Sequence, residues 1–158
     1  MSAWKKIALV AAGCGLAVYA YASKMTKMKA RLIVIPNVSV FKVSLTGLVL
    51  RANVLIKNYS SGSCSIKFPF VRLIYKETLL ASSNIIDKDI PIEPYGQVQI
   101  DQIDVDVPLS SVFSVVSALI NGIQNKQPIS ITVVTSTVID VGVQKFDYED
   151  SQTIPLKN

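Results

Sequence analysis

The sequence of 158 residues contains no histidine and only two cysteines, Cys14 and Cys64. Without histidine the chain lacks the commonest general base, Ser-His and Cys-His nucleophile pairs, and His-ligated zinc. The two cysteines supply neither a Cys-x-x-Cys pair nor the four ligands of a structural zinc site. A glycine-rich phosphate loop is also missing, because Gly13 and Gly15 lie inside an apolar run. We therefore expect no enzyme activity, no cofactor and no bound metal.

Acidic side chains are absent from the first 31 positions, which carry six lysines and arginines. The whole chain has a formal charge of +5, from 16 basic and 11 acidic side chains, so residues 32–158 hold ten basic and 11 acidic ones. This larger part is close to neutral and lacks the clustered basic face that binding to phosphates requires. We expect no nucleic-acid partner.

Residues 7–23 form an uncharged run of 17 residues, which as a helix would span about 26 Å. The apolar layer of a bilayer is about 30 Å thick, so the run is short but long enough to cross it. Aromatic and basic residues at both ends are typical of interface anchors; the flanks are Trp4, Lys5, Lys6, Lys24, Lys27, Lys29 and Arg31. The pattern predicts a single-pass membrane anchor over residues 1–31, with its orientation undetermined because both flanks are basic.

A cleaved signal peptide is the alternative interpretation of the same segment. Lys5 and Lys6 precede the apolar run, and Ala20-Tyr21-Ala22 before Ser23 fits a cleavage site. The basic residues that follow at once are typical of a stop-transfer flank and favour retention of the anchor. Cleavage after Ala22 stays open.

From Leu32 onward apolar residues alternate with polar ones, which predicts a domain of short strands over residues 32–158. The alternation changes phase at Pro69, where we expect a strand to bend or change its buried face, and again at Asp101–Gln102, where we expect a β-bulge. Residues 110–123 instead have helical spacing, with Ser110 or Ser111 available as a cap. We predict a mostly β fold of six to eight strands: an antiparallel, immunoglobulin-like β-sandwich with one amphipathic helix on a sheet.

Two groups of carboxylates could in principle serve acid–base chemistry or bind calcium. For both groups, however, we favour the interpretation that they lie on a solvated strand face or edge. They are Asp101, Asp104 and Asp106 in one group and Asp147, Glu149 and Asp150 in the other. Asn37 and Asn58 each begin an N-glycosylation pattern. For Asn58 a turn, in which its side chain bonds nearby backbone groups, explains the residue better.

The order of these features resembles a known family. A strand ending at Val54-Leu55-Ile56-Lys57-Asn58 is followed by the strand Ile66–Tyr75 and an edge at residues 76–81. Next come residues 90–96 (Ile-Pro-Ile-Glu-Pro-Tyr-Gly), the strand Val98–Val107 and a last strand ending at residues 154–156. Residues 32–156 thus resemble the late embryogenesis abundant type 2 domain, also called the water stress and hypersensitive response (WHy) domain. The family's Asn-Pro-Asn motif is represented only by its first residue, Asn58.

The resemblance implies a compact β-sandwich, often attached to an N-terminal anchor, without known catalytic residues and with roles in stress protection or scaffolding. Together with residues 7–23, it favours a non-enzymatic, membrane-anchored domain that binds or stabilises a membrane or protein surface. Its partners would be the lipid bilayer and proteins of a membrane-associated assembly. One alternative is a structural protein that links the internal membrane of a virus particle to its capsid. Another is a lipid-binding module with a groove between its sheets.

Overall fold

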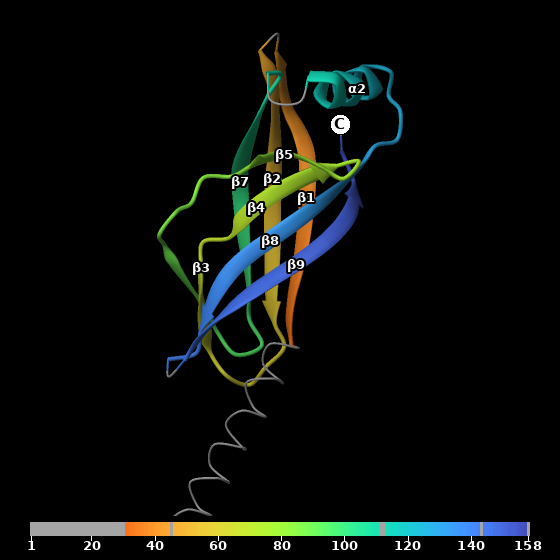
Figure 1. The fold of residues 1–158 in the computed structure, drawn as a ribbon. Coiled ribbons are helices and arrows are strands. Elements are labelled where there is room, and N and C mark those ends of the chain that lie inside the picture. The colour runs from red at the N-terminus through yellow and green to blue at the C-terminus, as the bar shows by residue number, and fades with distance from the viewer. Residues whose placement is uncertain (1–30, 45, 111–112, 143, 158) are drawn as a thin grey trace, which may run out of the picture.

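The computed structural model describes residues 31–44, 46–110, 113–142 and 144–157, and the structural statements below concern these residues. They form nine strands and one helix, which Figure 1 shows. In chain order the elements are β1 (Leu32–Ser44), β2 (Gly47–Asn58), β3 (Cys64–Lys67), β4 (Phe70–Tyr75), β5 (Thr78–Ser82), β6 (Asp89–Ile92), β7 (Gln97–Pro108), α2 (Phe113–Gln124), β8 (Ser130–Asp140) and β9 (Lys145–Pro155). The described helix is too short to cross a membrane, and the expected anchor at residues 7–23 lies outside the described residues.

The strands form two antiparallel sheets. The first has the order β1-β2-β7, and the second is built around β8, which pairs with β9 on one side and with β3 and β4 on the other. Strand β6 extends β3, and β5 extends β4. At the β1 side, the Nε2 of Gln152 donates to the carbonyl of Val34 at 2.7 Å, and Lys157 exchanges backbone hydrogen bonds with β1. The end of the chain thus closes one side of the sandwich.

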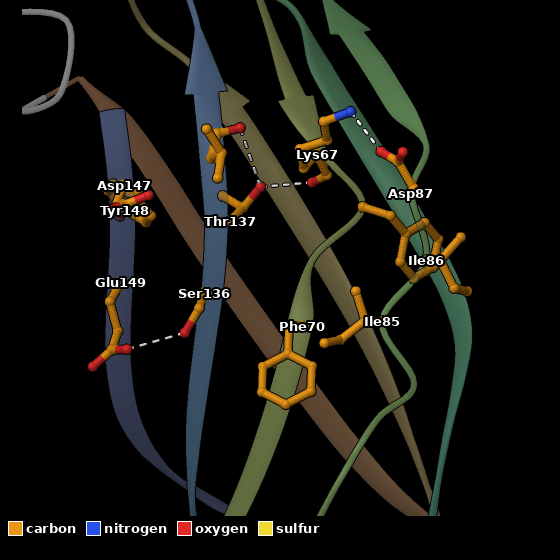
Figure 2. A pocket seen from close by; sticks show the side chains of 12 residues that line it. Lys67, Phe70, Ile85, Ile86, Asp87, Ser136, Thr137, Asp147, Tyr148 and Glu149 are labelled. Carbon is orange, nitrogen blue, oxygen red and sulfur yellow. Dashed lines mark hydrogen bonds and ion pairs between the residues drawn. The ribbon is translucent and has the colours of Figure 1, made fainter. Parts of the chain in front are cut away.

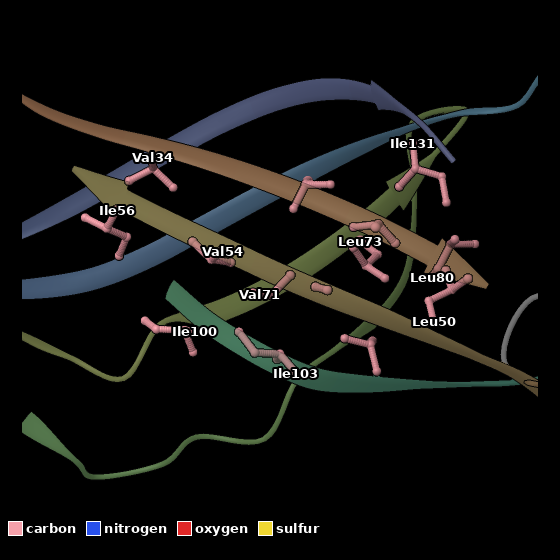
Figure 3. Close-up of a cluster of buried hydrophobic side chains, with 14 of the residues drawn as sticks. Val34, Leu50, Val54, Ile56, Val71, Leu73, Leu80, Ile100, Ile103 and Ile131 are labelled. Carbon is pink, nitrogen blue, oxygen red and sulfur yellow. The ribbon is translucent and has the colours of Figure 1, made fainter. Parts of the chain in front are cut away.

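Apolar side chains from both sheets meet in one core (Figure 3). Val54, Val71, Val105 and Ile131 have no exposed surface, and each comes from a different strand. Every second residue of β2 from Leu48 onward is buried, as its alternating pattern predicts. The predicted mostly β, antiparallel fold with a helix is confirmed, with nine strands in place of six to eight.

Both predicted changes of phase are present. Opposite Asn53, strand β7 carries one extra residue, and Gln102 adopts a φ of 61° while its amide donates to the Asn53 Oδ1 at 2.9 Å. This bulge returns Ile100 and Ile103 to the same buried face. At Pro69 the strand is interrupted between β3 and β4, because proline cannot donate a hydrogen bond to the ladder.

The helix lies at a different place from the one expected. Residues Phe113–Gln124 cover the end of the sandwich beside the β1–β2 turn, rather than a sheet face (Figure 1). Val116 and Leu119 are fully buried and fill the space between the sheets at that end. Amphipathic spacing predicts that one face is buried but not which surface covers it, and this is why the position was wrong.

Candidate binding surfaces

A groove of about 580 Å³ lies on the outer side of the second sheet, where β3 is separated from β4 (Figure 2). Most of its apolar lining comes from the interrupted strand and from residues 83–88, and most of its polar lining comes from β8 and β9. The lining residues are Lys67, Phe68, Phe70, Ile85, Ile86, Asp87, Ser136, Thr137, Val138, Asp147, Tyr148 and Glu149.

The interruption at Pro69 explains why the groove exists. Strands β5 and β6 follow the two halves of the broken strand, so residues 83–88 must cross the gap between them. The crossing is fixed at both ends: Ser83 pairs with Val71 through its amide and its Oγ, and the amide of Phe68 donates to Lys88 at 2.7 Å. Between these ends the chain bulges outward, and Ile85 is 85% exposed.

Ion pairs line the rim of the groove. Lys67 Nζ lies 2.6 Å from an Asp87 oxygen and 3.1 Å from one of Asp89. The hydrogen bond to Lys67 lowers the pKa of Asp87, and the same bond raises the pKa of the lysine. On the opposite side, Glu149 accepts from Arg72 at 2.8 Å and from the Ser136 hydroxyl at 3.0 Å. The groove therefore combines apolar walls with a charged rim, an arrangement suited to binding an apolar or extended segment.

A second surface forms at the end of the sandwich where β1 begins, which we call the entry pole and define as Arg31 with loops 58–63 and 93–96. Asn58 is 1% exposed and organises it. Its Nδ2 donates to the carbonyls of Gly62 at 2.8 Å and Glu93 at 3.1 Å. Its Oδ1 accepts from the Ser60 amide at 2.9 Å and the Ser60 hydroxyl at 2.6 Å. The predicted turn role of Asn58 is confirmed by these hydrogen bonds.

Two tyrosines project from the entry pole. The amide of Tyr59 donates to the carbonyl of Arg31 at 2.9 Å, and the amide of Tyr95 donates to the carbonyl of Ser60 at 3.0 Å. Their side chains are 49% and 68% exposed, respectively. The backbone of both residues is thus fixed, while their rings face solvent next to the point where the chain enters the sandwich.

The first group of predicted carboxylates lies on the exposed side of β7, as expected. Asp104 forms a two-pronged pair with Arg51, at 2.7 and 2.9 Å, whose guanidinium also lies 3.6 Å from the centre of the Phe41 ring. The pKa of Asp104 is lowered mainly by this hydrogen bond. Asp101 instead accepts from Gln99. These contacts are those of a strand face, and no cluster that could hold a metal occurs among the described residues.

The second group lies on the edge strand β9, also as expected. Glu149 belongs to the rim of the groove, Asp147 lines it, and Asp150 accepts from Gln152 at 2.7 Å. Of the cysteines, Cys64 is a buried free thiol whose pKa is raised by burial, and Cys14 lies outside the described residues.

The glycosylation patterns differ in their accessibility. Asn58 is buried and both its amide hydrogens are used, so the folded domain does not offer it to a modifying enzyme. Asn37 lies within β1, paired with Asn53 of β2. Of the predicted anchor flanks only Arg31 is described, and it is exposed at the start of β1. Trp4, Lys5, Lys6, Lys24, Lys27 and Lys29 lie outside the described residues.

Sequence reasoning missed Tyr59 and Tyr95 at the entry pole and Ile85 and Ile86 at the groove. The tyrosines are separated by 36 positions, and their loops are joined by the Asn58 side chain and by the bond from the Tyr95 amide to the Ser60 carbonyl. The sequence did contain a signal for the two isoleucines. Ile85 and Ile86 are adjacent apolar residues in a turn-rich stretch, where no alternating strand pattern would bury them.

No family model and no curated protein sequence matches the chain. Among solved structures, a protein from Archaeoglobus fulgidus is similar with a TM-score of 0.50 and 9% identity, covering 80% of this chain and 94% of that one. A Northeast Structural Genomics Consortium target, SoR45, has a TM-score of 0.54 and 7% identity, with coverage of 83% and 89%. At these identities the likeness concerns the fold alone.

A candidate late embryogenesis abundant (LEA) protein is also among the similar structures. It has 18% identity and a TM-score of 0.40, and the match covers 98% of this chain and 87% of that one. A TM-score of 0.40 is too low to support an assignment of this chain to that family. The resemblance to the type 2 domain therefore rests on the sequence features described above.

Proposed function

We propose that this protein is a non-enzymatic β-sandwich held at a membrane by residues 7–23, where it has a structural, protective or scaffolding role. The immunoglobulin-like arrangement rests on the strand pattern of the sequence, and the protective role rests on the resemblance to the LEA type 2 domain. The bilayer and neighbouring proteins of the same assembly are its proposed partners. A single-pass location in a cell envelope or virion membrane belongs to the same proposal.

One observation carries this proposal: the sandwich begins directly after the basic flank of the apolar run. Strand β1 starts at Leu32, and the carbonyl of Arg31 is already fixed by the amide of Tyr59. Only residues 24–30 separate the end of the apolar run from this fixed point. A domain connected in this way stays close to whatever surface holds residues 7–23.

Alkaline carbonate extraction of membranes from cells that express the full-length chain tests the anchor. We expect the chain to stay with the membrane pellet. Leu16→Lys places a charge near the middle of the run, where insertion costs about 3 kcal/mol, and should release the chain. Ser23→Lys at the basic flank is the matched control and should stay in the pellet. Release of the unmodified chain would refute the anchor.

The mass and location of the same protein separate the remaining possibilities. A chain that lacks residues 1–22 would show cleavage after Ala22 and exclude a retained anchor. Fixed stoichiometry in purified virus particles would favour the alternative of a link between internal membrane and capsid. A location confined to cellular membranes would instead favour a cellular scaffold.

The groove supports a second candidate function, lipid binding, in a form different from the one expected. Side chains such as Val54 and Val71 fill the space between the sheets, which counts against a groove there. An acyl chain could instead lie in the outer groove, against Phe70 and Ile86. Displacement of a fluorescent fatty acid tests this: Ile86→Lys should weaken binding at least tenfold, and Ile35→Lys, a similarly exposed control outside the groove, should not. Equal effects would refute it.

A further inference from the structure

We propose that the entry pole docks on the lipid–water interface of the membrane that holds residues 7–23, with Tyr59 and Tyr95 seated among the lipid headgroups. This inference rests on the proposed function, and it adds an orientation: the sandwich stands on its entry pole with α2 facing away from the bilayer. The occupant of this surface is the bilayer itself, and the reason lies in the length of the connecting chain.

The connection is too short to keep the entry pole far from the bilayer. From Ser23 to Arg31 the chain makes eight steps, which extend to at most about 29 Å. The connection carries Lys24, Lys27 and Lys29, and each basic residue close to an anionic leaflet is attracted to it. Any shortening of the connection brings Arg31, and the loops bonded to it, down to the headgroups.

The side chains presented there suit that environment. Tyrosine has an apolar ring with a polar tip, and it is enriched where a membrane meets water. Beside the two tyrosines, Ile33 on β1 is 45% exposed and pairs in register with Lys57 of β2. Apolar surface next to a lysine is typical of a lipid-interface contact. Glu93 is the exposed acid of the two loops. Two nearby cations, Arg31 and Lys57, outnumber it.

The backbone at Tyr95 is a further, independent observation. Its φ is 54°, a left-handed conformation that glycine or asparagine adopts at lower cost than tyrosine. The exposed ring contributes little to the core, so burial within the fold does not explain why tyrosine stands there. Contact with a surface outside the chain does explain it.

The opposite end of the sandwich provides a matched control. Phe113 at the start of α2 is 69% exposed, against 68% for Tyr95, and belongs to the other end of the molecule (Figure 1). Strand β1, with 13 residues, spans roughly 40 Å between the two ends. An aromatic probe at either position thus has the same exposure in solution and a different expected distance from the bilayer.

The experiment uses the full-length chain, with its single tryptophan removed by Trp4→Phe, reconstituted in phosphatidylcholine vesicles that contain about one third phosphatidylglycerol, an anionic lipid. The lipids are brominated close to the headgroup end of their acyl chains, so that they quench tryptophan at the interface. We expect the Tyr95→Trp chain to lose about half of its emission and the Phe113→Trp chain less than about a tenth. The Tyr59→Trp chain should be quenched like Tyr95→Trp, and it provides a second probe if that variant misfolds.

Equal, weak quenching at all three positions in chains that float with the vesicles would overturn the docking and leave the anchor standing. Chains that do not float with the vesicles would overturn both the anchor and the docking. Strong quenching of Phe113→Trp with weak quenching of Tyr95→Trp would place the opposite end on the bilayer and refute this orientation.

Discussion

Replacing Asn58 by alanine tests whether one buried amide holds the two loops of the entry pole together. The side chain makes four hydrogen bonds, two through Nδ2 to the carbonyls of Gly62 and Glu93, and two through Oδ1 to the amide and hydroxyl of Ser60. It is 1% exposed, so water does not replace these bonds in the folded state. The variant keeps strand β2 and the backbone bonds between the loops, and it removes only the side-chain connection.

The expected magnitude follows from what each partner loses. Gly62 O still accepts from the Ser60 hydroxyl, and Glu93 O still accepts from the amide of Gly96. The Ser60 amide, in contrast, loses its acceptor. At about 1 kcal/mol for each bond, with a larger cost for a donor left unpaired, Asn58→Ala should lower the free energy of unfolding by about 3 kcal/mol. In a domain of this size that corresponds to a fall in melting temperature of roughly 10 °C.

Urea unfolding of the full-length chain in detergent micelles, followed by near-ultraviolet circular dichroism of the tyrosines, measures this change. Ser60→Ala removes only the bonds of the hydroxyl and should cost about 1 kcal/mol. A loss below about 1 kcal/mol for Asn58→Ala would refute the view that this amide organises the entry pole.

Asn58→Asp makes the same test depend on pH. A carboxylate here would face the carbonyl oxygens of Gly62 and Glu93, so burial and repulsion would raise its folded pKa above the unfolded value of about 3.9. With a raised folded pKa, stability is fully present below the unfolded pKa and is lost as the pH rises through the folded pKa. The free energy of unfolding of the variant should therefore fall increasingly below that of the wild type between about pH 4 and pH 7. A difference in this free energy that does not depend on pH would contradict the expectation.

Three further variants, one of them with a matched control, test other parts of the fold by the same unfolding measurement. Glu77→Gly should stabilise the β4–β5 hairpin by about 0.5–1 kcal/mol, because Glu77 has a φ of 64°; destabilisation would be inconsistent with that turn. Thr135→Val should stabilise by about 1 kcal/mol, because this buried hydroxyl has no partner among the described residues, whereas Thr132→Val breaks a 2.8 Å bond and should not stabilise. Asp104→Asn removes the pair with Arg51. That pair lowers the folded pKa of Asp104, so its contribution to stability is present above the unfolded pKa and is lost as the pH falls through the folded pKa. The difference in the free energy of unfolding between wild type and variant should therefore disappear in acid.

The sequence was sufficient for features that depend on neighbouring residues. The change of phase around Gln102 located the bulge, because a single inserted residue reverses which side chains are buried. The proline at position 69 located the break between β3 and β4 for a similarly local reason. Asn58 was predictable as a turn residue because its side chain bonds backbone groups within four positions.

Features that depend on distant pairing could not be predicted. The bond from Asn58 to Glu93 spans 35 positions, and the pair of Arg72 with Glu149 spans 77. The alternation of apolar and polar residues along a strand predicts which side chains face outward or inward. The register between strands decides which of these side chains contact each other. The groove and the entry pole both depend on such register, so neither was visible from the pattern alone.

Both candidate surfaces arise where the hydrogen-bonded ladders stop, and this has a consequence for function. At the groove the interrupted strand leaves residues 83–88 fixed at their ends and exposed between them, with Ile85 85% exposed. At the entry pole the loops are instead connected to each other by the Asn58 side chain and by the bond from the Tyr95 amide to the Ser60 carbonyl, so Tyr59 and Tyr95 project from a fixed backbone. A fixed presentation suits a flat, featureless partner such as a bilayer, because no entropy of loop ordering is lost on contact. The groove, whose crossing is held at its ends and at Asp87 and is exposed around Ile85, suits a partner to which this exposed stretch can adjust.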